Sequence, residues 1–335
     1  MSKIKAAIIG CGEYGWLHAK VIHNLELFDL YAFVNRNIEK AKKLHAEFGS
    51  DDAYFCSDYM QVINDPDIEV VYVCTTHDVH FPIAMAAIEA GKHIFMEKPL
   101  AMTVEHCEMI EDAVRNSNIK FFVGHKMRFS KNVQRAVNEM PKPITIIAQM
   151  MCSRWSEDFW AQCPIKGGGN VLSQGCHIFD LVTYLSGSEP ESLYAEGGTY
   201  THEGGSLIDN IVATMRFKNG AIASITLGDS GLNEYTSKTM IQLYGGDDCI
   251  NLSNRLTDYA RFRPNRKDEI SIWPREFMNA WDKSDPEGIY AENRAFFDCI
   301  VNDTEPPVGA KQGADSVRMV TAAFKAIRDR SIIHF

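Results

Sequence analysis

The sequence lacks several features that would assign it to other classes of protein. Among its 335 residues, no apolar run approaches the about 20 residues that a membrane-spanning helix needs. The N-terminal stretch MSKIKAAIIG passes from lysines directly into a short strand-like run, without the apolar core of a secretory signal. There is no internal repeat and no low-complexity tract. We therefore expect a globular cytoplasmic protein that does not enter a membrane.

Excess positive charge and paired cysteines are also missing. The formal net charge is -10 at pH 7, and because binding to a polyanion requires a positive patch, we expect no nucleic-acid or anionic-membrane partner. The nine cysteines include no CxxC pair, and most of them lie inside apolar runs, which indicates reduced and mainly structural thiols. We predict no metal site.

The first part of the chain alternates short strands with helices. Runs rich in β-branched and aromatic residues lie at 4–10, 30–35, 69–75, 93–98 and 120–124. Between them, Ala41, Leu44 and Phe48 recur at helical spacing, and Gly91 stands where a helix C-cap is expected. Such alternation is typical of a parallel sheet. We predict a doubly wound, Rossmann-type α/β domain over residues 1–124.

The second part has a different pattern. Longer strand-like runs, ITIIAQMM, NIVATMRF, AIASITLG and KTMIQLYGG, follow residue 125, and the pair Asn219-Gly220 between two of them is a strong hairpin signal. Two helices are expected at about 287–302 and 313–329, where Val317, Val320 and Phe324 recur at helical spacing. Residues 125–335 are therefore predicted to form an α+β domain on a mainly antiparallel, open-faced sheet, with final helices that can pack back on the first domain.

A glycine-rich hexapeptide, Gly10-Cys11-Gly12-Glu13-Tyr14-Gly15, follows the first predicted strand and opens a helix. In this context GxGxxG indicates a dinucleotide site: the first glycine permits the turn, the second lets the backbone approach the pyrophosphate, and the third packs helix on strand. The phosphates then face unpaired N–H groups at the helix N-terminus. The alternative interpretation is a glycine-rich turn without a ligand.

The residues at the end of the second predicted strand indicate whether the cofactor is NAD or NADP. An NAD enzyme normally places Asp or Glu there to bind the adenosine ribose, whereas this strand ends Asn35-Arg36-Asn37. Asparagine removes the carboxylate that would repel a 2′-phosphate, and Arg36 can pair with that phosphate. We therefore favour NADP over NAD. In the alternative, Arg36 points to solvent and Asn35 still bonds the ribose.

Three motifs together make the chain resemble the glucose-fructose oxidoreductase, inositol dehydrogenase and MocA family: the glycine loop, Glu97-Lys98-Pro99 and the segment GGGNVLSQGCHIFD at 167–180. The resemblance covers nearly the whole length. It implies NAD or NADP binding in the N-terminal domain, substrate and oligomer contacts on the C-terminal sheet, and redox chemistry on sugars or polyols. By position, Lys98 is the family's active-site lysine and His177 its active-site histidine.

The chemistry of hydride transfer is consistent with these roles. Oxidising a secondary alcohol requires removal of the hydroxyl proton, and a histidine with an unperturbed pKa of about 6.5 can accept it near neutral pH. Lys98, a cation at the carboxyl end of a parallel strand, can polarise the reacting oxygen. The plainer interpretations are a core histidine and a surface lysine.

The family pattern is broken one helical turn before the histidine. Many members carry Asp there, whereas this chain has Ser173. A hydroxyl can hydrogen-bond substrate or His177, but it cannot serve as a base at neutral pH. We therefore assign Ser173 a positioning role in a site whose chemistry rests on Lys98 and His177.

Several further side chains complete the predicted site. His77 stands where the family has a different residue, so it either bonds cofactor or substrate or simply enters a helix, while His80 matches a family histidine. Trp155 offers an aromatic face to a sugar or serves packing, and Arg128 borders the cleft or lies in a solvated turn. The predicted cofactor contacts are Gly10, Gly12, Glu13, Tyr14, Gly15, Asn35, Arg36, Thr75, His77, His80 and Glu97. The predicted substrate contacts are Lys98, Arg128, Trp155, His177 and Asp180.

The leading hypothesis is an NAD(P)-dependent oxidoreductase acting on a sugar, polyol or related keto-sugar, assembled as a homodimer or homotetramer through the C-terminal sheet. Two other functions stay open. The family includes glycosidases that use NAD without net redox change, and the loss of Asp at position 173 is compatible with such a departure. It also includes a cofactor-sensing regulator, against which the presence of Lys98 and His177 argues.

Overall fold

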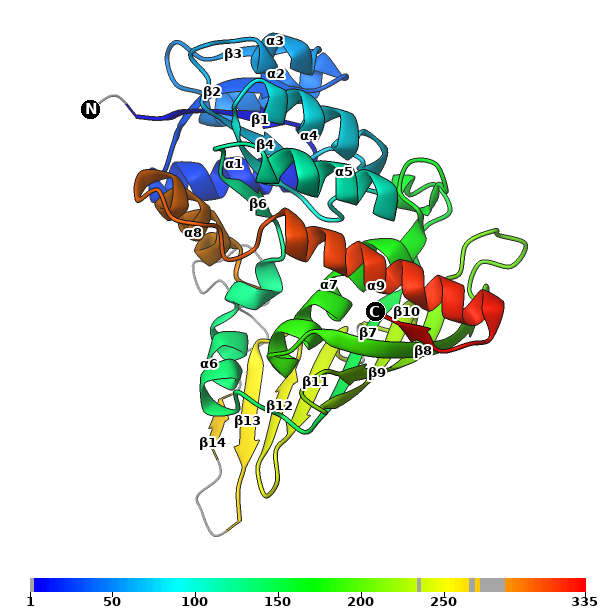
Figure 1. Cartoon of the computed structure of the whole chain (residues 1–335). Helices are drawn as coiled ribbons and strands as arrows, with labels where there is room; N and C mark the ends of the chain where they lie inside the picture. Colours follow the sequence, from blue (N-terminus) through cyan, green and yellow to red (C-terminus); the bar gives the residue numbers. More distant parts are fainter. Residues whose placement is uncertain (1–2, 234–235, 265–268, 272–286) are drawn as a thin grey trace. The chain divides into compact units, whose positions relative to one another are not determined.

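The structure is a computed structural model that describes residues 3–233, 236–264, 269–271 and 287–335 (Figure 1). The chain divides into two compact units. The first unit comprises Met1–His125 and Tyr290–Ala314, and the second comprises Lys126–Ile289 and Asp315–Phe335. Each unit is built around its own sheet.

The first unit carries a six-stranded parallel sheet in the order β3-β2-β1-β4-β5-β6. All strands run parallel, and the order in which successive strands are added reverses between β1 and β4, as in a Rossmann fold. Its elements are β1 (Lys5–Ile9), α1 (Glu13–Leu25), β2 (Asp29–Val34), α2 (Ile38–Phe48), β3 (Tyr54–Cys56), α3 (Tyr59–Ile63), β4 (Val70–Val73), η1 (His77–Val79), α4 (His80–Glu89), β5 (His93–Met96), α5 (Val104–Arg115), β6 (Phe121–Val123) and α8 (Ile289–Val301).

Burial explains why these strands are continuous apolar runs. All four residues of β4 are buried, as are the last four of β1, because helices cover both faces of a parallel sheet. Side-chain caps fix the start of three helices. Asn37, Asp58 and Thr103 each accept a hydrogen bond from a backbone N–H in the first turn of α2, α3 and α5, respectively. The five predicted strands are confirmed; β2 is as long as its predicted run but begins one residue earlier, and the other four are shorter than theirs. The short edge strand β3 was not predicted.

The second unit carries a nine-stranded sheet in the order β14-β13-β12-β11-β7-β10-β9-β8-β15. Its elements are η2 (Lys126–Phe129), α6 (Lys131–Glu139), β7 (Thr145–Ser153), η3 (Trp160–Gln162), α7 (Gly169–Ser186), β8 (Pro190–Gly198), β9 (Asn210–Phe217), β10 (Ile222–Gly231), β11 (Thr239–Tyr244), β12 (Cys249–Ser253), β13 (Asp258–Phe262), β14 (Glu269–Ser271), α9 (Ala310–Asp329), whose first turn belongs to the first unit, and β15 (Ile333–His334).

Alternation of buried and exposed residues shows that one face of this sheet is covered and one is open. Every second residue of β7 and β9 is buried, and α7 packs against β7, β9 and β10 (Figure 1). The predicted hairpin at Asn219-Gly220 joins β9 to β10. β10 pairs in parallel with β7, so the sheet is mixed although mainly antiparallel. The predicted fold class, a Rossmann domain and an α+β domain with an open-faced sheet, is confirmed.

All nine cysteines are free and seven of them are buried.

Within the described part of the chain, no helix is both long enough and apolar enough to cross a bilayer.

Candidate active site

The glycine loop is fixed by close backbone contacts. Gly10 has φ of 102°, and a Cβ built there would lie 2.4 Å from the carbonyl oxygen of Cys74 at the end of β4. A Cβ at Gly15 would lie 2.0 Å from the carbonyl oxygen of Gly10, so α1 packs directly on the loop that precedes it. These two glycines hold the loop between the neighbouring strands β1 and β4.

Gly12 differs from both, because no described atom lies within 4 Å of a Cβ built at that position. It is the N-cap residue of α1 and makes no side-chain capping hydrogen bond. Among the described residues the space beside Gly12 is therefore open at the start of α1, where the exposed Glu13 and the half-buried Tyr14 follow. This uncapped helix start has the donors and the room that a pyrophosphate requires, so the loop fits a dinucleotide.

Asn35 connects the second strand to the same loop. Its Oδ1 accepts the backbone N–H of Cys11 at 3.1 Å, and its Nδ2 donates to the carbonyl oxygen of Asn37 at 3.0 Å. Both amide atoms of Asn35 are thus engaged within the protein. Arg36 is exposed, and its guanidinium has no partner among the described residues. An exposed cation beside the loop is the residue type that a 2′-phosphate would use.

The segment after β4 carries two buried histidines. His77 and His80 are 4% and 0% exposed, and their rings meet edge to face at 5.7 Å. His80 Nδ1 lies 2.8 Å from the carbonyl oxygen of Pro99, and its Nε2 lies 3.3 Å from that of Thr75. Burial lowers the pKa of His80 despite both carbonyls. A neutral imidazole donates only one hydrogen bond, and the shorter distance assigns it to Pro99.

Glu97 and Lys98 follow β5, at the carboxyl edge of the parallel sheet. They are 6% and 7% exposed. Glu97 Oε2 accepts the backbone N–H of Lys98 at 3.2 Å, and Glu97 Oε1 lies 3.0 Å from Nε2 of the fully buried His18 on α1. Lys98 is therefore buried, and its backbone N–H is held by the carboxylate of Glu97. His18, Glu97 and Glu292 also place three potential metal-ligand atoms within 4.8 Å of one another, although the hydrogen bond between His18 and Glu97 already accounts for two of them.

In the second unit, the glycine-rich segment 167–169 starts α7. A Cβ at Gly167 would lie 2.2 Å from Cα of Ala161, so only glycine fits there, and Gly168 caps the helix in the left-handed conformation. Three buried polar residues follow on one side of the helix, three or four residues apart: Asn170, Ser173 and His177. Neither amide atom of Asn170 has a hydrogen-bond partner among the described residues, although this residue is 1% exposed.

Arg128 and Asp180 form a bidentate ion pair between η2 and α7. Arg128 Nε lies 2.8 Å from Asp180 Oδ2, and Nη2 lies 2.6 Å from Oδ1. The guanidinium also lies over the ring of Tyr184 at 4.9 Å. Burial lowers the pKa of Arg128, but the adjacent carboxylate more than offsets this effect and the pKa is raised. Both carboxylate oxygens of Asp180 are therefore engaged by Arg128.

The segment before α7 carries the predicted aromatic residues and an unpredicted histidine cluster. Trp155 meets Phe159 edge to face at 5.0 Å. Nearby, His202 Nδ1 lies 2.8 Å from Glu157 Oε1 and its Nε2 lies 2.7 Å from Oδ2 of the fully buried Asp229. Arg154 pairs with Glu157 at 2.9 Å. The aromatic segment is thus tied to β10 by an imidazole that lies between two carboxylates.

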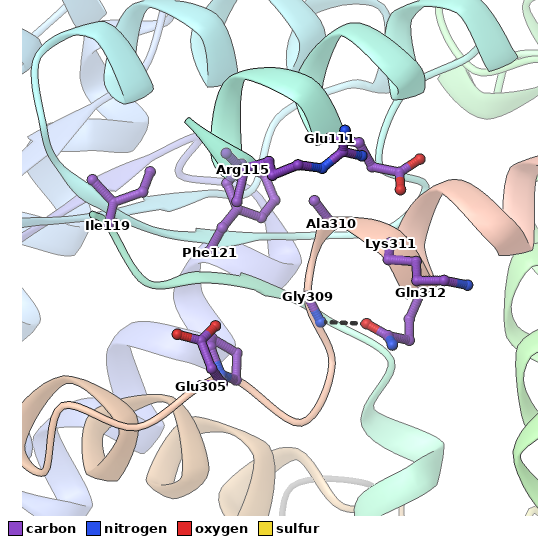
Figure 2. Close-up of a pocket in the computed structure, with 11 residues that line it drawn as sticks. Glu111, Arg115, Ile119, Phe121, Glu305, Gly309, Ala310, Lys311 and Gln312 are labelled. Atoms are coloured by element: carbon purple, nitrogen blue, oxygen red, sulfur yellow. Dashed lines mark hydrogen bonds between the residues drawn. The ribbon is translucent and has the colours of Figure 1, made fainter. Parts of the chain in front are cut away.

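A separate hollow of about 300 Å³ lies in the first unit, between α5 and the start of α9 (Figure 2). Charged side chains of both signs, Glu111, Arg115 and Glu305, line it, and the Gly309 N–H donates to Gln312 Oε1 at 2.9 Å. None of the predicted cofactor or substrate residues lines this hollow. We assign no ligand to it.

Comparisons with known proteins bear on this arrangement. Residues 4–125 match the family profile described as "Oxidoreductase family, NAD-binding Rossmann fold", and residues 142–247 match the "GFO/IDH/MocA C-terminal domain". The chain belongs to the glucose-fructose oxidoreductase, inositol dehydrogenase and MocA family. The resemblance inferred from the sequence motifs is confirmed.

Relatives within this family align over nearly the whole chain. A myo-inositol 2-dehydrogenase of Thermotoga maritima is 25% identical, with 98% of this chain and 97% of the relative covered. A scyllo-inositol 2-dehydrogenase (NADP(+)) of Bacillus subtilis is 24% identical, with 98% and 95% covered. The structure of a levoglucosan dehydrogenase in complex with NADH and levoglucosan shares the fold with a TM-score of 0.87, at 22% identity and 99% coverage of both chains.

Within each unit, the structure brings together most of the predicted residues. The loop at 10–15, Asn35 and the turn after β4 gather at the carboxyl edge of the parallel sheet, while Ser173, His177 and Asp180 share α7. Sequence reasoning missed His18, Asn170 and His202. A signal was present for Asn170, since a polar residue one turn before Ser173 falls on the same helical face. The partners of His18 and His202 come from distant segments, so no local pattern indicates them.

Proposed function

We propose that this member of the family is an NAD(P)-dependent oxidoreductase that transfers a hydride between the nicotinamide and a sugar, polyol or related keto-sugar. The observation that carries this assignment is the uncapped start of α1 behind Gly12, which offers donors and room to a pyrophosphate. The bound nicotinamide supplies or accepts the hydride. Relatives named as inositol and levoglucosan dehydrogenases support the substrate class.

Three residues of this chain perform the remaining chemistry in the proposal. Lys98, buried at the end of β5, polarises the reacting oxygen and stabilises its developing negative charge. His177 accepts the hydroxyl proton during oxidation and returns it during reduction. Ser173, one turn earlier on α7, positions the substrate or the imidazole, because a hydroxyl cannot act as a base at neutral pH.

Asn170 extends the substrate contacts in the same proposal. The buried amide of Asn170 has no hydrogen-bond partner within the described part of the chain, and buried polar groups of this kind usually bond a ligand or water. An amide both donates and accepts, which suits the hydroxyl groups of a sugar or polyol. We therefore place Asn170 beside Ser173 and His177 among the residues that recognise substrate hydroxyls.

The test is an absorbance assay of nicotinamide reduction with myo-inositol, scyllo-inositol, levoglucosan and a set of aldoses, each with NAD and NADP. For the best substrate, we expect Lys98→Met and His177→Phe to lower kcat by about 10²–10⁴-fold. Lys42→Met, which removes an exposed lysine of α2, is the matched control and keeps the wild-type rate. Full activity of either site variant contradicts the assigned roles. Glycoside cleavage without net reduction supports the redox-neutral glycosidase instead.

The preference for NADP is a separate part of the proposal. It is supported by the exposed guanidinium of Arg36, which has no partner among the described residues, and by the absence of a carboxylate at Asn35. Charge-assisted hydrogen bonds contribute about 1.5–3 kcal/mol, so we expect Arg36→Ala to weaken NADPH binding by about 10–100-fold and NADH binding by less than about twofold. Calorimetric titration measures both, with Lys42→Ala as the control of equal charge. Tighter binding of NADH than NADPH by the wild type overturns the preference.

We further propose that the open face of the nine-stranded sheet forms a homodimer or homotetramer. Apolar side chains on this face are exposed on neighbouring strands: Ile147 on β7, Val212 on β9 and Ile222 on β10, at 36%, 54% and 43%. Light scattering coupled to size exclusion is expected to give a dimer or tetramer that dissociates on Val212→Glu. A monomeric wild type refutes this assembly.

A further inference from the structure

A continuous set of buried hydrogen bonds runs from two helices to the backbone of Lys98. His18 of α1 is fully buried, and its Nε2 lies 3.0 Å from Oε1 of Glu97. The other carboxylate oxygen of Glu97 accepts the backbone N–H of Lys98 at 3.2 Å. One carboxylate therefore joins an imidazole on α1 to the peptide that carries Lys98.

The residue that bonds the other ring nitrogen of His18 comes from a distant part of the sequence. Asn293 of α8 is fully buried, and its Oδ1 and Nδ2 lie 3.1 Å and 3.0 Å from Nδ1 of His18. An ionised Glu97 can only accept, so Nε2 of His18 carries a proton. Nδ1 then lies against the amide of Asn293, which fixes the ring from its other side.

Packing alone does not account for these polar groups. The His18 ring packs against the rings of Tyr72 and Phe95, with centroids 5.5 Å and 4.7 Å apart, and an apolar aromatic ring would make the same contacts. Burying an imidazole and a carboxylate is unfavourable unless each is matched. Glu97 also lies close to the backbone of Gly124, since a Cβ added there would be 3.4 Å from its Cδ. The matched polar set therefore serves orientation.

We propose that His18 is a positioning residue for Lys98: by holding the Glu97 carboxylate, with Asn293 behind it, His18 fixes the peptide from which the lysine side chain extends. This inference rests on the proposed function, in which Lys98 polarises the reacting oxygen. The ammonium lies at the end of a long side chain, so a small rotation of the peptide is amplified at Nζ. A displacement of about 1 Å at a catalytic group can reduce the rate by about 10²-fold.

The decisive variant is His18→Phe, which keeps the aromatic packing and removes both hydrogen bonds. His18→Gln is the conservative partner, because its amide can still donate to Glu97. His23→Phe, on the exposed side of the same helix, is the matched control. We expect His18→Phe to lower kcat by about 10–100-fold with NADH affinity changed by less than about twofold, and His18→Gln to restore most of the rate. In a Lys98→Met background, His18→Phe is expected to cause no further loss.

A second measurement needs no substrate. Trace acetylation with acetic anhydride, followed by peptide mass spectrometry, gives the reactivity of Lys98 relative to the exposed Lys42. We expect His18→Phe to change this ratio by at least about threefold across the pH range, and His18→Gln to return it towards the wild-type value. A residue that only supports the fold would lower the melting temperature without changing the ratio. Should His18→Phe not fold, Asn293→Leu removes only the outer hydrogen bond and is expected to shift the ratio in the same direction.

The outcomes separate this inference from the proposed function. If Lys98→Met abolishes turnover while His18→Phe leaves both kcat and the Lys98 ratio unchanged, the positioning role is refuted and the function stands. If Lys98→Met keeps full turnover, the catalytic role of the lysine fails, and the acetylation ratio alone decides whether His18 orients it. An equal loss from His18→Phe in the wild-type and Lys98→Met backgrounds also refutes action through Lys98.

Discussion

Two substitutions that add the same methyl group to the glycine loop should have opposite effects on stability and on cofactor binding. At Gly12, an alanine Cβ meets no described atom within 4 Å, and the residue has φ of −87° and ψ of −161°, which alanine adopts readily. At Gly15, the same Cβ would lie 2.0 Å from the carbonyl oxygen of Gly10 and 3.0 Å from its carbonyl carbon. Comparing the two variants therefore distinguishes the space for a cofactor beside Gly12 from the packing of α1 on the loop at Gly15.

The structure gives the expected size of each effect on folding. Alanine is a poorer N-cap than glycine by about 0.5–1 kcal/mol, but it lowers the entropy of the unfolded chain by a similar amount, so Gly12→Ala should leave the melting temperature within about 3 °C. Gly15→Ala forces backbone atoms apart by about 1 Å, because an unstrained carbon–oxygen contact is about 3.3 Å. This overpacking should cost about 3 kcal/mol or more and lower the melting temperature by about 6–12 °C.

The effect on the cofactor follows from mass action. At a concentration of NADH about 100 times the Kd, binding stabilises the native protein by about 2.7 kcal/mol. If the Gly12 methyl group weakens binding about tenfold, the same concentration stabilises Gly12→Ala by only about 1.4 kcal/mol, so the thermal shift is halved. Thermal melts with and without NADH measure both quantities, and calorimetric titration checks the Kd. A Gly12→Ala variant with a wild-type thermal shift refutes a pyrophosphate at Gly12, and a Gly15→Ala variant with wild-type stability refutes the close packing of α1.

Two predictions concern ion pairs of the second unit. Arg128→Met leaves the Asp180 carboxylate buried without its bidentate partner, so we expect the free energy of unfolding in urea to fall by about 3–5 kcal/mol. Adding Asp180→Asn to this variant should recover part of the loss. An unchanged free energy of unfolding in Arg128→Met would mean that the pair contributes nothing to stability. For His202, burial lowers the pKa but the hydrogen bonds with Asp229 and Glu157 raise it by more, so the folded-state pKa is raised. The resulting stabilisation is complete below about pH 6.5 and is lost as the pH rises through the folded pKa, so His202→Gln should lower the melting temperature more at about pH 6 than at about pH 9. Equal losses at both pH values would show that protonation of His202 does not stabilise the fold.

Local signals in the sequence were sufficient to predict five of the six strands of the first sheet and the glycine loop at 10–15. Strands buried on both faces are continuous apolar runs, and the loop at 10–15 needs glycine for reasons that lie within a few residues of it, together with the neighbouring strand. The family motifs around Lys98 and His177 were read in the same way. The short strand β3 was not predicted, because three residues carry too little periodicity to be distinguished from a loop.

Other features depend on partners that meet only in three dimensions. Two examples are the parallel pairing of β7 with β10 and the ion pair between Arg128 and Asp180, each of which joins segments far apart in the chain. The same holds for His18, whose partners are 79 and 275 residues away. The sequence by itself was sufficient to predict the main apolar strands of the first sheet and the glycine loop at 10–15, since these follow from short-range periodicity and backbone geometry. Only the tertiary structure decided which buried polar groups are paired, because a hydrogen bond depends on distance and direction between atoms that the order of residues does not specify.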